Sequence, residues 1–325
     1  MTALPDSRVP LDADAAASAF DLILDGVAEA HEVKRFLVDM AERDETSVEI
    51  AAAVQAMRAR MVRVKAPANA IDVCGTGGDG SHSLNVSTAV AIVVAACDVP
   101  VAKHGNRAAS SKAGAADTLE ALGLNLDRAS DVAEETLADL GIAFLFAQKH
   151  HPALAKLAPI RKEIGRRTIF NLTGPAANPA GVKRQLIGVA RPDFLPVYAG
   201  ALERLDYEDA MLVAGDEPLD ELSVERDSSL IRLGRPLERI RPEDAGLSRH
   251  PAAALRGGDA AYNAAALHRL LMGERGAYRD AVLFNAAAAL IVAGEANNWT
   301  QGVEEAAEAI DKGLAKALLD CWVAY

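Results

Sequence analysis

The sequence has few cysteines, no long apolar run and no recognisable export signal. Its 325 residues include three cysteines, at positions 74, 97 and 321. Their odd number and wide spacing predict reduced thiols rather than disulfides or a metal centre. The apolar runs at 89–97 and 286–293 are too short to span a bilayer, and the first residues lack the basic and apolar regions of a secretory leader. We therefore expect a soluble, cytoplasmic protein.

Positive charge is also scarce. The formal net charge is −12 at pH 7 and the isoelectric point is about 5.1, which argues against a protein that binds nucleic acid or an anionic membrane surface. The chain has no G-x-S-x-G nucleophile motif, no Walker A lysine motif and no His/Cys/Asp set with zinc spacing. Covalent nucleophilic catalysis, hydrolysis of nucleoside triphosphates and zinc chemistry are therefore disfavoured. An acidic protein that binds phosphate must gather its cations locally or recruit a divalent metal.

Two glycine-containing loops flank one apolar helical segment, and this pairing is the most informative feature of the chain. The loop at 75–80 follows a β-like run at 70–74 and leads into the apolar segment at 89–96. The loop at 103–107 follows a second β-like run at 99–102. This order predicts a βαβ unit whose loops lie at the carboxyl edge of a parallel sheet. Glycines let a ligand approach the backbone and a helix N-terminus favours an anion, so we expect an anionic ligand.

A dinucleotide-binding unit is the first alternative, because Gly75, Gly77 and Gly80 satisfy G-x-G-x-x-G. That pattern alone is weakly specific. A dinucleotide unit also needs an acidic residue after the second strand, to bind the ribose hydroxyls. Here the second strand leads into Lys103 and His104, which suit phosphate. We therefore expect no nicotinamide or flavin cofactor, and no pyridoxal phosphate.

Composition divides the chain into a helical and an α/β part. Residues 11–63 are alanine-rich with interleaved charges, which predicts helices. Strand-like and helix-like segments alternate from residue 71 onward, which predicts a mostly parallel sheet covered on both faces. The polar, basic and proline-bearing stretch at 149–179 is expected to return to the helical part and to form the far wall of a cleft that binds ligand. The expected domains are a helical domain at 1–67 with a returning segment at about 150–180, and an α/β domain at 68–149 and 181–325.

Individual elements follow from capping residues and periodicity. The expected helices are 15–26, 28–42, 47–63 with Ser47 as its N-cap, 131–140 with Ser130 as its N-cap, 193–205, and most of the chain after 260. The expected strands downstream of the βαβ unit are 142–146, 185–189 and 210–214. Glu308 and Lys312 have the spacing of an i,i+4 ion pair.

Several polar residues are candidates for phosphate binding. Ser87 and Thr88 fall at the predicted start of the helix, where their hydroxyls and the free N–H groups face the ligand, although either residue serves as an ordinary helix cap in many proteins. The second loop then brings together three cations and two hydroxyls, at Lys103, Arg107, Lys112, Ser110 and Ser111. A solvated basic turn is the alternative, but it does not explain why Gly105 and Asn106 interrupt the cations.

Carboxylates and one arginine complete the set. Asp220 and Glu221 follow the strand at 210–214, so they lie at the same sheet edge as the glycine loops. Adjacent acids beside a phosphate site would repel the ligand unless Mg²⁺ lies between them. Asp216 and Glu217 compete for that role, and acidic pairs are common in surface loops. Arg161 has the guanidinium fork that binds a carboxylate, although a lone arginine is more commonly a surface charge.

Together these motifs resemble the anthranilate phosphoribosyltransferase family. They are G-T-G-G-D-G at 75–80, N-V-S-T at 85–88, K-H-G-N-R at 103–107 with S-S-K at 110–112, Arg161, F-N-L-T-G-P at 170–175 with N-P at 178–179, L-D-E at 219–221 and N-A-A-A-A-L at 285–290. The likeness extends from the N-terminal helices to about residue 296. The motifs are long, ordered and jointly specific.

The resemblance implies transfer of the phosphoribosyl group of phosphoribosyl pyrophosphate to the amine of anthranilate, with loss of pyrophosphate, in tryptophan biosynthesis. It also implies a small helical domain beside a larger α/β domain, a homodimer formed through the helical domain, and about two Mg²⁺ ions. The implied catalytic residues are Arg161, Asn106 and Lys103. The implied ligands of phosphoribosyl pyrophosphate are Gly75, Gly77, Gly78, Asp79, Ser83, Asn85, Val86, Ser87, Thr88, Lys103, Arg107, Ser110, Ser111 and Ala115. Anthranilate is expected at Gly75, His104, Asn106, His151, Arg161, Gly174 and Pro175, and magnesium at Ser87, Asp220 and Glu221.

Some positions depart from the family pattern. Ser83 stands where threonine is usual, and Ala115 replaces a common serine. Ala176 and Ala177 replace a leucine–threonine pair, a change expected to loosen the aromatic pocket. Two alternatives stay open: a pyrimidine nucleoside phosphorylase of similar fold, and a non-catalytic relative that binds nucleic acid. The residues expected to bind anthranilate are all present, which disfavours the first: they are Asn106, Arg161, Gly174 and Pro175. The net charge of −12 disfavours the second.

Overall fold

The computed structural model describes residues 3–108, 112–217 and 219–325. Its strands are β1 (Ile71–Gly75), β2 (Val101–Gly105), β3 (Ile142–Phe146), β4 (Arg184–Gly188), β5 (Asp209–Gly215), β6 (Ser228–Arg232) and β7 (Leu237–Ile240). Its helices are α1 (Ala13–Asp25), α2 (Ala30–Glu42), α3 (Ser47–Arg58), α4 (Val86–Ala95), α5 (Ala115–Ala121), α6 (Leu126–Asp131), α7 (Ala133–Asp139), α8 (Ala147–His150), α9 (Pro152–Ala155), α10 (Ala158–Ile164), α11 (Ile169–Ala176), α12 (Leu195–Glu203), α13 (Ala260–Leu271), α14 (Ala277–Ala293), α15 (Trp299–Asp311) and α16 (Leu314–Ala324). Short 3-10 turns lie at 192–194, 242–245 and 252–255.

One mixed, mostly parallel sheet forms the centre of the fold. Its strand order is β3-β2-β1-β4-β5-β6-β7. The strands β1 to β5 run parallel, and β6 and β7 add to the β5 side in antiparallel register. The order reverses between β1 and β4, so loops from both sides of β1 meet at the carboxyl edge of the sheet. In open parallel sheets this is where ligands bind.

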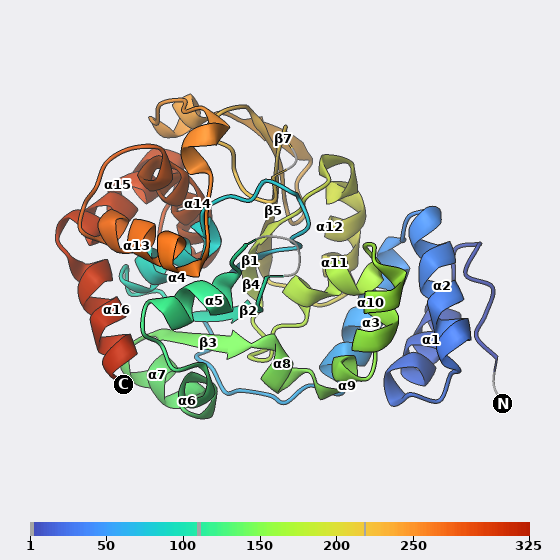
Figure 1. The fold of residues 1–325 in the computed structure, drawn as a ribbon. Coiled ribbons are helices and arrows are strands. Elements are labelled where there is room, and N and C mark those ends of the chain that lie inside the picture. Colours follow the sequence, from blue (N-terminus) through green and yellow to red (C-terminus); the bar gives the residue numbers. More distant parts are fainter. Residues whose placement is uncertain (1–2, 109–111, 218) are drawn as a thin grey trace.

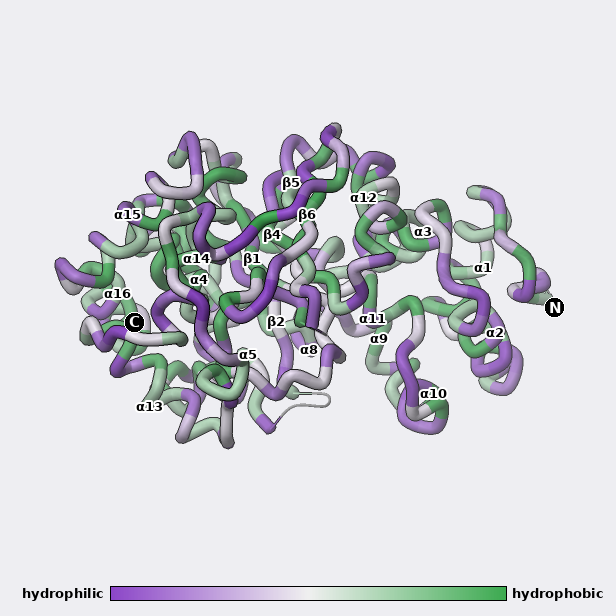
Figure 2. The backbone as a smooth tube through the Cα atoms, turned by 90° about the horizontal axis from the view of Figure 1, so that it is seen from above, coloured by the Kyte–Doolittle hydropathy of each residue, from purple (hydrophilic) through white to green (hydrophobic). Residues whose placement is uncertain are grey.

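Helices cover both faces of the sheet (Figure 1). The apolar helices α4 and α14 lie on one face, with α13, α15 and α16 outside them, and their side chains form a single buried cluster with β1, β2 and β3. The other face packs on α11 and α12, and α3 packs on both of these helices. Figure 2 shows the same division from above, with α1 to α3 on one side of the strands and α13 to α16 on the other. The predicted fold class, N-terminal helices beside an α/β domain with a mostly parallel sheet, is therefore confirmed.

The domain boundaries stay a prediction. The returning segment contributes α10, which packs on α2, and α11, which packs on α3. Helix α12 lies after residue 181 in the chain, yet it contacts both α3 and β5. It therefore bridges the helices and the sheet, and the structure does not by itself mark where one domain ends.

Most predicted elements agree with the structure. The strands β1, β3, β4 and β5 lie where expected to within one or two residues, and β2 begins two residues later than predicted. The ion pair between Glu308 and Lys312 is present. Among the described residues no helix is both long enough and apolar enough to cross a bilayer.

Two local predictions are wrong, and two strands were missed. Thr46, and not Ser47, caps α3, because its hydroxyl and the Glu49 carboxylate form a reciprocal capping box. The expected helix at 131–140 is broken at Val132 into α6 and α7, and the Ser130 hydroxyl donates back to the Leu126 carbonyl instead of capping a new helix. The antiparallel strands β6 and β7 were not expected.

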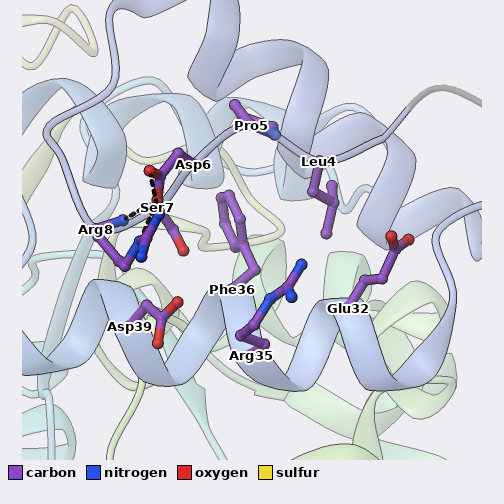
Figure 3. A pocket seen from close by; sticks show the side chains of 9 residues that line it. All are labelled: Leu4, Pro5, Asp6, Ser7, Arg8, Glu32, Arg35, Phe36 and Asp39. Carbon is purple, nitrogen blue, oxygen red and sulfur yellow. Dashed lines mark hydrogen bonds and ion pairs between the residues drawn. The ribbon is translucent and has the colours of Figure 1, made fainter.

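A hollow of about 330 Å³ lies between the N-terminal segment and α2 (Figure 3). Its lining is mixed in charge, and the guanidinium of Arg8 pairs with Asp6 at 2.8 Å. Arg35, Asp39 and Glu32 line the α2 side. The N-terminal segment and α2, whose residues line the hollow, lie at the end of the molecule away from the strands (Figure 1).

Candidate active site

The strands β1, β2, β4 and β5 each end in glycine, at Gly75, Gly105, Gly188 and Gly215. Glycine at these positions lets other backbone segments cross the strand ends closely. A Cβ atom on Gly75 would lie 2.0 Å from the Oδ2 atom of Asp220, and one on Gly188 would lie 1.5 Å from the Asp220 carbonyl oxygen. The two glycines therefore let the loop that carries Asp220 lie across the centre of the sheet edge.

Replacing Gly188 by alanine tests this packing. We expect Gly188→Ala to lower the free energy of unfolding by about 1–3 kcal/mol, as overpacking does, because the Asp220 backbone has to move. Gly174→Ala is the matched control, since a Cβ at Gly174 meets nothing within 4 Å. Urea unfolding measures both variants, and a Gly188→Ala protein as stable as the wild type would contradict the close approach.

Three carboxylates gather beside the first glycine loop. The Asp220 carboxylate accepts a hydrogen bond from the Gly77 N–H at 2.7 Å, and the Asp220 N–H donates to Asp79 at 3.5 Å. Glu221 accepts from the backbone N–H of Ser87 at 3.3 Å. Burial and the neighbouring charge of Asp79 raise the pKa of Asp220 to about 7, and burial with the charge of Asp220 raises the pKa of Glu221. The cluster is thus short of positive charge.

Helix α14 fixes the loop that carries Asp220 and Glu221. The Asn285 amide of α14 accepts from the Leu222 N–H at 2.9 Å and donates to the Leu222 carbonyl at 3.2 Å. A small cavity of about 20 Å³ lies among Ser87, Asp220, Glu221 and Asn285. In the described part of the chain, no group of three or more His, Cys, Asp and Glu side chains is arranged to hold a metal alone. These residues therefore fit a cation such as Mg²⁺ only if ligand oxygens or water complete its shell.

Lys103 is the buried cation of the site. Its ammonium group donates to the Val73 carbonyl at 2.8 Å and to the Ser87 hydroxyl at 3.3 Å. Only 2% of the residue is exposed. Burial lowers the pKa of Lys103, while the charge of Asp72 opposes that shift most strongly. The lysine therefore lies next to the N-terminus of α4, where an anion would complete its contacts.

The backbone N–H groups at the start of α4 favour the binding of an anion. Val86, Ser87 and Thr88 form the first turn, whose N–H groups have no helical partner. The Thr88 hydroxyl is buried without a hydrogen-bond partner. The Asn85 side chain is already engaged, because it accepts from Thr118 at 2.6 Å and from Asn263 at 2.9 Å. Asn85 is thus fixed by structural contacts in this conformation.

The first loop has the backbone that its glycines predict. Gly77, Gly78 and Gly80 have φ angles of +67°, +78° and +74°, in the left-handed region that favours glycine. Ser83 forms an isolated bridge with Arg256, and its hydroxyl accepts from Ser81 at 3.3 Å. A hollow of about 230 Å³, lined in part by Asp79, Ser81 and Ser83, opens beside this loop.

The second loop is less open than the sequence suggests. Arg107 forms ion pairs with Asp117 at 2.8 Å and Glu120 at 2.9 Å, so its guanidinium does not lie free. The Asn106 amide oxygen accepts from the Arg107 N–H at 2.8 Å. Ala115 is the first residue of α5. The predicted ligands Ser110 and Ser111 lie outside the described residues.

Two neutral histidines lie at the end of β2 and after α8. The rings of His104 and His151 are 5.0 Å apart, and the Nδ1 atom of His104 lies 3.0 Å from the Gly174 carbonyl oxygen. A carbonyl only accepts, so Nδ1 carries the proton and the buried, unpartnered Nε2 atom of His104 is an acceptor. Burial lowers the pKa of His104 to about 3 and that of His151 to about 4.

The buried histidines predict a loss of stability in acid. The unfolded chain binds these protons near pH 6.5 and the folded chain does not, so the stabilisation is complete above that pH and is lost as the pH falls toward 4. We expect the wild type to lose about 1 kcal/mol more unfolding free energy than His151→Gln between about pH 7.5 and about pH 5.5. Urea unfolding at both pH values measures this, and parallel losses would contradict it.

Arg161 lies on α10 and is half-buried. Among the described residues its guanidinium has no hydrogen-bond or ion-pair partner, and burial lowers the pKa of Arg161. An unpaired, partly desolvated guanidinium is suited to a carboxylate ligand. No hydrogen bond or ion pair joins Arg161 to Asn106, His104 or Pro175 in this structure.

Sequence reasoning did not include several residues that build the site. Asp72, Asn178 and Gln185 form a buried polar cluster under the strand ends, and Gly188 and Asn285 shape the carboxylate loop. A signal was present for one of them, because Asp72 is an ionisable residue inside an otherwise apolar strand. Asn178 and Asn285 both stood in motifs that were recognised without a role being assigned to either residue.

Comparisons with known proteins show the family to which the chain belongs. Residues 67–316 match the glycosyl transferase family, a/b domain. The chain is 64% identical over 327 residues to the anthranilate phosphoribosyltransferase of Novosphingobium aromaticivorans, covering 100% of this chain and 99% of that one. The crystal structure of the Thermus thermophilus anthranilate phosphoribosyltransferase has a TM-score of 0.93 at 39% identity, covering 100% and 99% of the two chains.

A more distant structure carries ligands. The anthranilate phosphoribosyltransferase of Saccharomyces cerevisiae in complex with PRPP and Mg has a TM-score of 0.89 at 26% identity, covering 97% of this chain and 93% of that one. The same yeast protein has also been solved in complex with 4-fluoroanthranilate.

Proposed function

This chain belongs to the anthranilate phosphoribosyltransferases of the glycosyl transferase family, and from that membership we propose the part that each element of its sheet edge takes in the reaction. The protein transfers the phosphoribosyl group of phosphoribosyl pyrophosphate to the amine of anthranilate, a step of tryptophan biosynthesis. The observation that carries the assignment of roles is the meeting of Lys103, the α4 N-terminus and the Asp220 loop at one edge of the sheet.

Phosphoribosyl pyrophosphate binds along the first loop and the start of α4. The left-handed glycines let the substrate approach the backbone closely, and the first turn of α4 adds a positive dipole end and N–H groups without an intrahelical partner. Lys103 then supplies the buried charge. The predicted ligands Gly75, Gly77, Gly78, Asp79, Ser83, Val86, Ser87 and Thr88 all lie in this stretch, whereas Asn85 acts by holding the helix start.

Magnesium is held by Ser87, Asp220 and Glu221 together with substrate oxygens. A related enzyme contains Mg together with PRPP, and here the raised pKa values of Asp220 and Glu221 mark a cluster that a cation would stabilise. When bound, the metal neutralises negative charge on the pyrophosphate that leaves. We propose about two ions, since three carboxylates and a diphosphate meet there.

Anthranilate binds on the other side of the strand ends. The Arg161 guanidinium donates to its carboxylate, and Asn106, with the wall formed by His104, His151, Gly174 and Pro175, orients the ring. The aromatic amine is neutral at pH 7, so it attacks the ribose C1 without first losing a proton. Binding and alignment therefore carry the reaction, and direct displacement with inversion at C1 follows.

A homodimer formed through α1, α2 and α3 is part of the proposal, as are a cytoplasmic location and the division into a helical and an α/β domain. Light scattering after size exclusion should give a mass about twice the 34.1 kDa of one chain. A mass of one chain at micromolar concentration would contradict the dimer and leave the catalytic assignment intact.

Release of pyrophosphate tests the function directly. With phosphoribosyl pyrophosphate and Mg²⁺, purified protein should release pyrophosphate only after anthranilate is added, and EDTA should stop it. Cleavage of pyrimidine nucleosides by phosphate, without turnover of anthranilate, would favour the nucleoside phosphorylase alternative. Tight, salt-sensitive DNA binding without any turnover would favour the nucleic-acid-binding alternative.

A further inference from the structure

Asp72 is a fully buried carboxylate inside the central strand β1. It accepts hydrogen bonds from the Asn178 amide at 2.8 Å, the Gln185 amide at 3.0 Å and the His104 backbone N–H at 3.1 Å. The Cys74 thiol, 3.3 Å away, is a further donor. Burial raises the pKa of Asp72, while the charge of Lys103 and the donors around the carboxylate act against that shift.

The partners of Asp72 hold the segment that we assign to the anthranilate wall. The Gln185 amide that donates to Asp72 also donates to the Pro175 carbonyl at 2.8 Å. The Asn178 amide donates to the Ala102 carbonyl at 2.8 Å as well. His104, whose N–H donates to Asp72, contacts the Gly174 carbonyl through its ring. The stretch at 174–178 is therefore bound to β1, β2 and β4 by residues that all contact the Asp72 carboxylate or carry it.

The same cluster continues toward the N-terminal helices. The Tyr207 hydroxyl donates to the Gln185 amide oxygen at 2.9 Å, and Arg58 at the end of α3 donates to Tyr207 at 3.1 Å. Arg58 also donates to the Ala176 carbonyl at 2.9 Å. A continuous set of hydrogen bonds therefore runs from α3 to Asp72 along the assigned anthranilate wall.

The charge of Asp72 also acts on the phosphate side. Successive residues of a strand point to opposite faces. Lys103 reaches Ser87 of α4 on one face, while the Asp72 carboxylate meets Asn178 on the other. Both groups are buried, and Asp72 is the carboxylate that most favours the charged form of Lys103. Asp72 also accepts from the backbone N–H of His104, the residue after Lys103, at 3.1 Å, so it helps to fix the strand that carries the lysine we assign to pyrophosphate.

We propose that Asp72 is a positioning residue for both substrates, which fastens the anthranilate wall at 174–178 through Asn178 and Gln185 and supports Lys103 through the sheet. It touches neither substrate. The inference rests on the proposed function, since it assigns the two sides of Asp72 to the two ligands of that reaction.

Asp72→Asn tests the proposal with nearly unchanged volume. The new amide brings a donor against the donors of Asn178, Gln185 and His104, and so disturbs both the 174–178 segment and the β2 backbone beside Lys103. We expect the KM values for anthranilate and for phosphoribosyl pyrophosphate both to rise about tenfold or more. A merely structural role would lower the active fraction, and hence the apparent kcat, with both KM values unchanged.

Gln185→Met tests the anthranilate side of the proposal separately from the phosphoribosyl pyrophosphate side. It also keeps the proposal testable if the Asp72→Asn protein does not fold. It removes the donors to Asp72 and Pro175 and leaves the contact between Asp72 and the His104 N–H beside Lys103 in place. We expect the anthranilate KM to rise about fivefold and the KM for phosphoribosyl pyrophosphate to stay within about twofold. Asp209→Asn, which breaks the ion pair with Arg232 at the start of β5, is the matched control and should leave both KM values within about twofold.

The outcomes are distinct. Unchanged KM values in Asp72→Asn, or in Gln185→Met where Asp72→Asn does not fold, overturn the positioning role and leave the proposed function standing. A folded wild-type protein that does not consume anthranilate contradicts the proposed function itself and overturns this inference with it.

Discussion

Lys103→Met should lower kcat/KM for phosphoribosyl pyrophosphate by about 10²- to 10³-fold, the range seen when one preorganised group that faces developing charge is removed. The lysine is buried between the Val73 carbonyl and the Ser87 hydroxyl. Its charge is already desolvated and aimed at the start of α4, so no reorganisation is needed when pyrophosphate departs. Methionine keeps the length of the side chain and removes the charge.

Steady-state rates at varied phosphoribosyl pyrophosphate measure the effect. Lys312→Met is the matched control, because Lys312 is an exposed residue at the end of α15 that pairs only with Glu308 among the described residues. It should retain wild-type kinetics. A Lys103→Met enzyme within about threefold of wild type would show that the metal and the helix N-terminus suffice without the buried cation.

Arg161→Ala should raise the KM for anthranilate about 30- to 100-fold while changing the KM for phosphoribosyl pyrophosphate by less than about threefold. The guanidinium is half-buried and has no partner within the described chain. A substrate carboxylate would therefore gain a charge-assisted pair without breaking an existing one. The loss should fall on one substrate only.

Arg166→Ala is the control for this substitution. Arg166 is nearby in the chain and exposed, and it pairs with Glu42 of α2 at 3.3 Å. Its removal should leave both KM values near wild type. If Arg161→Ala raised the two KM values equally, Arg161 would be acting on the fold of the site and not on the anthranilate carboxylate.

Much of the α/β core could be predicted because its strands are short apolar runs bounded by glycine or proline. The strands β3, β4 and β5 are buried along nearly all of their length, and β1 is buried over its first three residues. The strands β6 and β7 escaped prediction, because β7 is exposed over most of its residues and carries no apolar alternation. They are strands because β6 pairs with β5 and β7 pairs with β6, which their own composition does not indicate.

The exact cap and break positions of helices were harder to predict from the sequence. Thr46 and Ser47 are both good helix caps, and the decision rests on Glu49, whose carboxylate also accepts from the Leu11 N–H at 2.9 Å. The break at Val132 depends on how α6 and α7 both pack on β3. The Thr46–Glu49 spacing was readable in the sequence as a capping box, whereas the packing of α6 and α7 on β3 is not revealed by periodicity in one segment.

The site residues could be predicted where they form a short contiguous motif. They could not be predicted where folding brings together residues from distant parts of the chain. The glycine loop, Lys103 and the Asp220–Glu221 pair stand in short runs. The cluster of Asp72, Asn178 and Gln185 joins residues more than 100 positions apart in the chain, so only the fold brings them together. Ala176 and Ala177, expected to loosen the aromatic pocket, are fully buried in the core beneath it. Their effect on acceptor range stays a prediction that kinetics with substituted anthranilates would test.

Anthranilate fluorescence followed over time is the measurement that tests the central claim most directly. Purified protein is mixed with anthranilate, phosphoribosyl pyrophosphate and Mg²⁺, with an EDTA control and an Asp220→Asn variant beside the wild type. The account predicts a loss of fluorescence that needs the sugar substrate and the metal and that is strongly slowed in the variant. No loss of fluorescence with folded wild-type protein would contradict it, and the sheet edge would then serve another acceptor.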